Sequence, residues 1–145
     1  MNAVPQLEEN GVTVWHFTTV EEDVEAGEGT VIGSCCFIGR GSRIGRNVHI
    51  QHGAFIARGS VIGDDVFIGP NAVLTDDKRP VAGKAYKAQP PYIANRCSIG
   101  AGAVIMPGVV LAPDAMVGAG AVVVHRVDAG ETVVGIPARQ LNHFM

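Results

Sequence analysis

Residues 49–74 read HIQHGAFIARGSVIGDDVFIGPNAVL and place an aliphatic residue at every sixth position. The aliphatic positions in this stretch are Ile50, Ile56, Ile62, Ile68 and Leu74. The same period extends back to Val14 and, after a break, resumes from Ile93 to Val123. Four positions after almost every aliphatic residue the side chain is small or β-branched. A period of six over this length indicates a repeat architecture and differs from the 3.6-residue period of an amphipathic helix.

Each hexad predicts a very short strand followed by a corner. In Val66-Phe67-Ile68, side chains 66 and 68 point to one side and 67 to the other. The following Gly69-Pro70-Asn71 consists of turn formers. Three hexads then close one triangular coil, and successive coils stack as parallel strands. The repeat therefore predicts an all-β fold, a parallel β-helix shaped as a triangular prism of about six coils.

The spacing also predicts one domain over residues 1–145, with coils at about 12–74 and 93–128 and a C-terminal cap at 129–145. The long interval from Leu74 to Ile93, where the period is interrupted, predicts one extended loop at 75–92. The loop is rich in charge and proline, and loops of this length in compact domains are often functional. A tolerated surface insertion is the other interpretation.

The composition and net charge indicate which kinds of partner and location to expect. Apolar residues make up 47% of the chain and charged residues 17%, with a net charge of −3, so neither disorder nor a nucleic-acid or anionic-membrane partner is indicated. The chain has no apolar run long enough to span a membrane, and its first residues lack the order of a signal peptide. Three cysteines without CxxC spacing favour a reduced, cytoplasmic protein.

Polar residues at the corners are the candidates for chemistry. His16, His52 and His125 each lie two positions after a repeat aliphatic, where side chains are solvent-exposed by default. Counting hexads in threes places His16 and His52 on one edge of the prism, and Asp76 and His125 on a second edge. If prisms associate side by side, His52 of one chain and Asp76 of another are expected to approach each other.

Cysteine and metal chemistry are less favoured. Cys36 and Cys97 occupy inward small-residue positions and are expected to be inert core residues, whereas Cys35 should face outward. A zinc site needs three or four converging ligands, and His49 and His52 should point in different directions. We therefore expect no metal.

The repeat, the loop and the terminal Val-Gly-Ile-Pro-Ala-Arg at 134–139 resemble the hexapeptide-repeat acyltransferases over residues 12–141. The resemblance implies a left-handed β-helix. Several segments are similar to the N-acetyltransferases that act on the 3-amino group of nucleotide-linked sugars. These segments are Val14-Trp15-His16-Phe17, Ile50-Gln51-His52 and the stretch from Val66 to Asp77 that is shortly followed by Pro80.

This sequence departs from that family at three positions. Asp76 stands where the family has an asparagine at the reaction centre, His52 replaces an asparagine, and Val81 replaces an arginine. By resemblance, Ala101 and Ala119 lie against the pantetheine of CoA through their backbones. His125 falls where a lysine is common, and Arg139 matches an arginine near the CoA phosphates. The family also implies a homotrimer with active sites between subunits.

The sequence thus predicts an acetyltransferase that moves an acetyl group from acetyl-CoA to an amino group of a nucleotide-linked sugar. Asp76 is the first candidate to orient or deprotonate the amine, and His52 is the second. Three alternatives stay open at this point: O-acetylation of a sugar with a histidine base, a metal enzyme similar to the γ-type carbonic anhydrases, and a non-catalytic scaffold.

Overall fold

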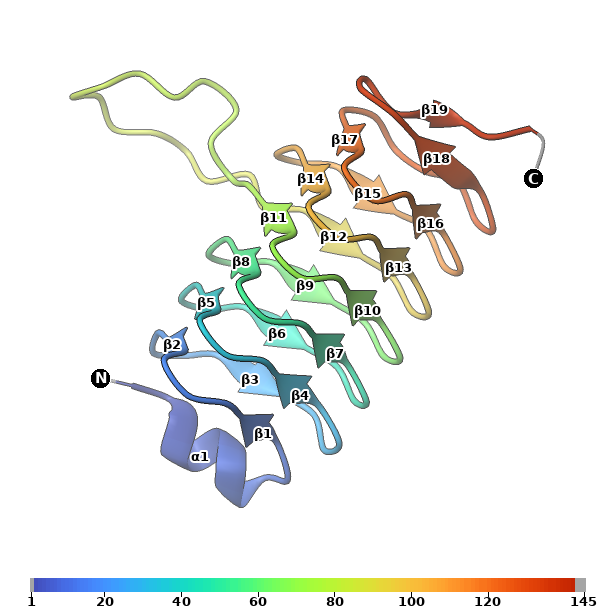
Figure 1. Cartoon of the computed structure of the whole chain (residues 1–145). Helices are drawn as coiled ribbons and strands as arrows, with labels where there is room; N and C mark the ends of the chain where they lie inside the picture. The colour runs from blue at the N-terminus through green and yellow to red at the C-terminus, as the bar shows by residue number, and fades with distance from the viewer. Residues whose placement is uncertain (1, 143–145) are drawn as a thin grey trace.

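Three parallel sheets wind around one axis to form a prism (Figure 1). The computed structural model describes residues 2–142, so the end of the predicted cap, 143–145, lies outside the described residues. The predicted parallel β-helix is confirmed, with coils that begin at Thr13. Among the described residues, no helix is long and apolar enough to span a membrane.

Each sheet takes every third strand of the chain. Sheet A contains β1 (Thr13–Val14), β4 (Val31–Ile32), β7 (His49–Ile50), β10 (Phe67–Ile68), β13 (Ser98–Ile99), β16 (Met116–Val117), β18 (Thr132–Val134) and β19 (Arg139–Gln140). Sheet B contains β2 (Thr19–Val20), β5 (Phe37–Ile38), β8 (Phe55–Ile56), β11 (Val73–Leu74), β14 (Val104–Ile105) and β17 (Val122–Val123). Sheet C contains β3 (Glu25–Ala26), β6 (Arg43–Ile44), β9 (Val61–Ile62), β12 (Tyr92–Ile93) and β15 (Val110–Leu111).

The strands pair in a constant register. Val31 pairs with His49, its equivalent three hexads further on, and the same step recurs within the coils on either side of the loop. Across the loop the step in sequence is longer, as from Val61 to Tyr92. The insertion nevertheless leaves the register of the prism unchanged, since each strand still meets its equivalent in the next coil.

The interior confirms the predicted pairing of one large and one small residue per hexad. The inward aliphatic side chains, such as Ile56 and Ile68, are 0% exposed. The small positions include three buried hydroxyl residues, Thr30, Ser42 and Ser60. Each hydroxyl donates to a backbone carbonyl, for example Ser42 Oγ to the Gly39 oxygen at 2.8 Å. Polar groups are therefore tolerated in the core because their hydrogen bonds are satisfied.

Glycines at the corners allow the coils to stack closely. A Cβ atom on Gly69 would lie 2.6 Å from the backbone nitrogen of Ala101, and one on Gly100 would lie 2.5 Å from that of Ala119. Both distances are far shorter than a van der Waals contact. Glycine at these two positions therefore brings Ala101 and Ala119 directly over the coil below.

Both ends of the prism are covered. Helix α1 (Val4–Glu9), which the repeat does not predict, lies across the first coil and buries Leu7 to 2% exposure (Figure 1). At the other end β19 runs antiparallel to β18 and terminates sheet A. The helix lies outside the hexad repeat, so the repeat does not predict it. Its position is explained by the end of the first coil, which it covers.

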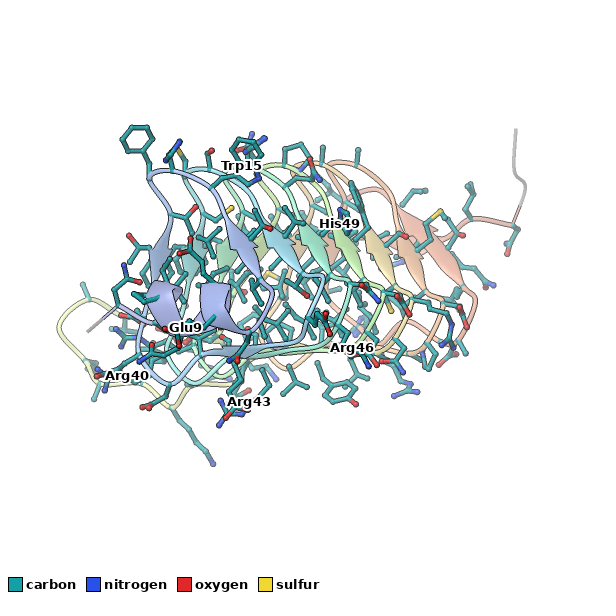
Figure 2. All side chains as sticks on the ribbon, turned by 90° about the horizontal axis from the view of Figure 1, so that it is seen from below. Glu9, Trp15, Arg40, Arg43, Arg46 and His49 are labelled. Carbon is teal, nitrogen blue, oxygen red and sulfur yellow. The ribbon has the colours of Figure 1, made fainter. Side chains whose placement is uncertain are left out.

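Ion pairs join the first coil to the second. Glu22, Glu25 and Glu28 pair with Arg40, Arg43 and Arg46, each at the equivalent position of the next coil. Arg40, Arg43 and Arg46 lie along one side of the prism in Figure 2, away from Trp15 and His49. The pairs are exposed, so each contributes about 0–1 kcal/mol to the free energy of unfolding. They fit the register that the paired strands already have.

Replacing Ile68 with alanine should lower the free energy of unfolding by about 2–5 kcal/mol, because a buried aliphatic side chain leaves a cavity. Replacing Phe67, its outward-facing neighbour at 42% exposure, should cost clearly less. Urea denaturation of both variants measures the difference. An equal or larger loss for Phe67→Ala would contradict the assignment of inner and outer faces.

Candidate functional site

Two rows of corner residues contain five of the six predicted site residues, and the sixth, Arg139, lies in β19. The A–B corner, which follows the strands of sheet A, contains His52, Ala101 and Ala119. The B–C corner, which follows the strands of sheet B, contains Asp76 and His125. The hexad count thus agrees with the structure on which residues share a corner.

His52 is oriented by the backbone of the coil below. The Ser34 N–H donates to His52 Nδ1 at 2.7 Å. Because this lone pair is occupied, the neutral imidazole carries its proton on Nε2 and offers an N–H donor to a ligand. His52 lines a hollow of about 180 Å³ together with Trp15, Gly33 and Gln51.

Asp76 lies where the chain leaves β11 for the loop. The Tyr86 hydroxyl, from the far part of the loop, donates to Asp76 Oδ2 at 3.1 Å, and the Gln89 N–H donates to the Asp76 carbonyl at 2.8 Å. The two bonds tie the returning loop to its starting point. The hydrogen bond to the Asp76 carboxylate, with its negative charge, raises the pKa of Tyr86.

The hollow around Asp76 has an aromatic and a charged side. Its volume is about 190 Å³, and its lining residues are Phe37, Phe55, Ala57, Arg58, Asp76 and Tyr86. The Phe37 and Phe55 rings stack with centroids 5.1 Å apart. Such a hollow combines an apolar surface with a hydrogen-bond acceptor, as small-molecule sites usually do.

Arg58 is fixed by a carboxylate two coils below. Its Nε and Nη2 donate to Glu21 at 2.9 Å each, a bidentate pair. The hydrogen bond from Arg58, together with the Arg40 N–H, lowers the pKa of Glu21 to about 2. Hexad reasoning missed both the Glu21–Arg58 pair and the Phe37–Phe55 stack. The two phenylalanines occupy equivalent positions in consecutive coils, which is a usable signal, whereas the ion pair spans two coils and depends on side-chain reach.

The structure does not bring His52 and Asp76 together within one chain. The two residues lie at different corners and line separate hollows. It does bring His125 and Arg139 together, because both line a hollow of about 200 Å³ to which β17, β18 and β19 contribute residues. His125 and Arg139 are therefore neighbours in space, although the whole of β18 separates them in sequence.

The backbones of Ala101 and Ala119 are accessible to a ligand. Both residues are exposed, and within the described part of the chain neither backbone N–H donates to an acceptor. The flanking Gly102 N–H, in contrast, donates to the Pro70 oxygen at 2.9 Å, and that of Gly120 to the Ala101 oxygen at 2.8 Å. Consecutive coils thus present two unpaired donors on one corner.

The burial of the cysteines follows the sequence analysis. Cys36 and Cys97 are buried, and burial raises the pKa of both thiols, whereas Cys35 is exposed. Raised pKa values keep the buried thiols protonated and unreactive. Across residues 2–142, no three histidine, cysteine, aspartate or glutamate side chains form a group that would hold a metal ion.

Comparison with protein families identifies the type of repeat. The family of bacterial transferase hexapeptide repeats matches residues 41–76 and 90–125. No curated protein matches the sequence significantly. The chain therefore carries bacterial transferase hexapeptide repeats, and it is a left-handed parallel β-helix.

Solved structures similar to this chain include sugar N-acetyltransferases. The acetyltransferase domain of PglB from Neisseria gonorrhoeae, in complex with acetyl coenzyme A, is 25% identical over 91% of this chain and 58% of its own, with a TM-score of 0.80. A variant of GDP-perosamine N-acetyltransferase from Caulobacter crescentus, in complex with CoA and GDP-perosamine, is 25% identical over 92% of this chain and 58% of its own (TM-score 0.78). WeeI from Acinetobacter baumannii is 29% identical over 95% of this chain and 63% of its own (TM-score 0.71). This chain thus spans less than two thirds of each of these proteins.

Changing Asp76 to asparagine should lower the pKa of Tyr86 toward the ordinary phenol value of about 10, because the neighbouring carboxylate no longer disfavours the phenolate. Absorbance titration in a Tyr92→Phe background isolates Tyr86, since the chain has two tyrosines. The exposed Asp65→Asn change is the control and should leave the titration unchanged. An unshifted Tyr86 curve in Asp76→Asn would mean that the contact does not persist in solution.

Proposed function

We propose that this chain transfers an acetyl group from acetyl-CoA to the amino group of a nucleotide-linked sugar. The observation that carries the proposal is the match of its β-helix, over 91% of its length, to an acetyltransferase domain bound to acetyl-CoA. The complex of CoA and GDP-perosamine with a second similar enzyme supports an amino-sugar nucleotide as acceptor.

In this proposal the pantetheine arm of the acyl donor lies along the A–B corner. The unpaired N–H groups of Ala101 and Ala119 are suited to the amide oxygens of pantetheine, which accept hydrogen bonds. Arg139 and His125, which share one hollow, are suited to the phosphates of CoA because Arg139 is always charged. These four residues are the proposed CoA-binding set.

The reaction forms a bond between the amine nitrogen and the acetyl carbon and breaks the bond from that carbon to sulfur. The amine loses one proton, and the departing thiolate of CoA takes one up. An amine titrating near 8 is already partly neutral at cytoplasmic pH, so alignment supplies much of the rate. Asp76 accepts the amine proton or holds the amine in line, since its second carboxylate oxygen is not used by Tyr86.

His52 acts as a hydrogen-bond donor in this scheme. With Nδ1 held by the Ser34 N–H, the neutral ring presents Nε2–H, which suits the developing oxyanion or the leaving sulfur better than proton abstraction. O-acetylation requires a strong base for a hydroxyl, and this geometry favours it less.

A homotrimer is part of the proposal, because Asp76 and His52 of one chain line separate hollows and a second chain is needed to join them. The outward face of sheet B supports such an association. The outward residues of β5, β8, β11, β14 and β17 are all apolar: Phe37, Phe55, Val73, Val104 and Val122. A continuous apolar strip on a surface is typical of an interaction site.

A cytoplasmic location completes the proposal. Cys35, Cys36 and Cys97 are unpaired, as is usual for proteins of a reducing compartment. Acetyl-CoA is also a metabolite of that compartment.

Acetyl-CoA at about 100 times its dissociation constant should stabilise the folded protein by roughly 2.7 kcal/mol, which thermal unfolding detects as a higher Tm. Release of free CoA in the presence of GDP-perosamine or another amino-sugar nucleotide then measures transfer. An unchanged Tm at millimolar acetyl-CoA would refute the acetyltransferase proposal.

Asp76→Asn should reduce kcat by about 10²–10⁴, the usual contribution of a positioned acid or base. Asp65→Asn, an exposed change at a distant corner, should leave kcat unchanged. His52→Asn should keep the Tm, because the asparagine oxygen replaces Nδ1 as acceptor for the Ser34 N–H, and should still lower kcat. Wild-type kcat in both Asp76→Asn and His52→Asn would show that neither residue acts at the reaction centre.

A further inference from the structure

The loop at 75–91 is a basic segment in an acidic protein. All three lysines of the chain, Lys78, Lys84 and Lys87, lie in it, together with Arg79. Its only acidic residues are Asp76 and Asp77, so its net charge is +2, whereas the whole chain carries −3. Figure 1 shows the loop projecting away from the prism between β11 and β12.

The cations of the loop are not used to hold the fold together. Six of the seven arginines outside the loop pair with carboxylates: Arg40, Arg43, Arg46, Arg58, Arg96 and Arg126. Among residues 2–142, no carboxylate lies within ion-pair distance of any of the four loop cations. Like charges gathered without partners repel each other, and an anionic ligand would remove this repulsion.

Three of these cations surround one hollow. It measures about 250 Å³ and is lined by Asp77, Lys78, Arg79, Ala85, Tyr86, Lys87 and Gln89. The one carboxylate in this lining, on Asp77, accepts a hydrogen bond from the backbone N–H of Arg79 at 3.0 Å. Pockets for whole ligands usually measure about 300–1,000 Å³, so this hollow suits one group of a ligand. Lysine and arginine together are the usual partners of phosphate.

Tyr86 connects this hollow with the candidate reaction site. It lines both the loop hollow and the hollow around Asp76, and its hydroxyl donates to the Asp76 carboxylate. A group bound in the loop hollow therefore lies one side chain away from an amine held at Asp76.

We infer that the loop hollow binds the diphosphate of the nucleotide-linked acceptor, an inference that rests on the proposed function. Both substrates carry phosphates, but only the acceptor has them next to the reacting part, because its diphosphate is attached directly to the sugar ring. In acetyl-CoA the whole pantetheine arm separates the phosphates from the thioester. Lys78, Arg79 and Lys87 are thus residues that select a nucleotide-linked sugar over a free one.

The test compares two double variants that each remove two positive charges. Lys78→Gln/Lys87→Gln changes the loop hollow, and Arg43→Gln/Arg46→Gln changes exposed arginines of the second coil that do not line this hollow. Calorimetry measures binding of UDP, GDP, dTDP and CoA to the wild type and to both variants. Thermal unfolding of the free proteins establishes that each variant is folded.

We expect the loop variant to bind the preferred nucleoside diphosphate at least tenfold more weakly, and CoA within twofold of the wild type. The control variant should bind both ligands as the wild type does. A loss confined to CoA, a loop variant equal to the control, or a wild type that binds none of the three nucleoside diphosphates overturns the inference. Failure of the wild type to bind CoA, with nucleoside diphosphate binding intact, instead overturns the proposed donor.

Discussion

Backbone hydrogen bonding from each coil to the next is the constraint on which the whole structure depends. Each strand pairs with its equivalent in the next coil, as Val31 does with His49, and the constant step places equivalent residues in straight columns. A triangular coil leaves room inside for one aliphatic and one small side chain per hexad. At the corners the coils approach so closely that Gly69 and Gly100 have no space for a Cβ atom. Size limits inside and glycine at the corners therefore follow from the same stacking.

The corners of the prism accept different polar side chains without a change in the fold. A residue two positions after each aliphatic points away from the core, so His52 or Asp76 changes the surface without disturbing the packing. The loop uses the same freedom, because a chain that leaves one corner and returns to it keeps the register of the next coil. The fold thus separates the residues that maintain the prism from those that contact ligands.

The charged residues are divided in the same manner, between pairs on the prism and cations in the loop that are unpaired within residues 2–142. Carboxylates of the first coil pair with arginines of the second coil along the stacking direction, as Glu25 does with Arg43. The Glu21–Arg58 pair extends this pattern over two coils, and Arg58 lines the Asp76 hollow. The loop cations, in contrast, have no such partners among the described residues, which is the property expected of groups that meet an anionic substrate.

The sequence by itself determined the β-helix, its inward residues, the position of the loop and the corner on which each candidate residue lies. These features follow from a period of six, since local alternation and a constant coil length specify them without knowledge of distant contacts. Only the tertiary structure decided that Tyr86 returns to Asp76, that Ser34 occupies Nδ1 of His52, and that α1 covers the first coil. These contacts depend on how a loop folds back and on which side chain reaches across the coils. No repeat encodes them, because each joins residues that lie outside the period or whose side-chain directions the period does not specify.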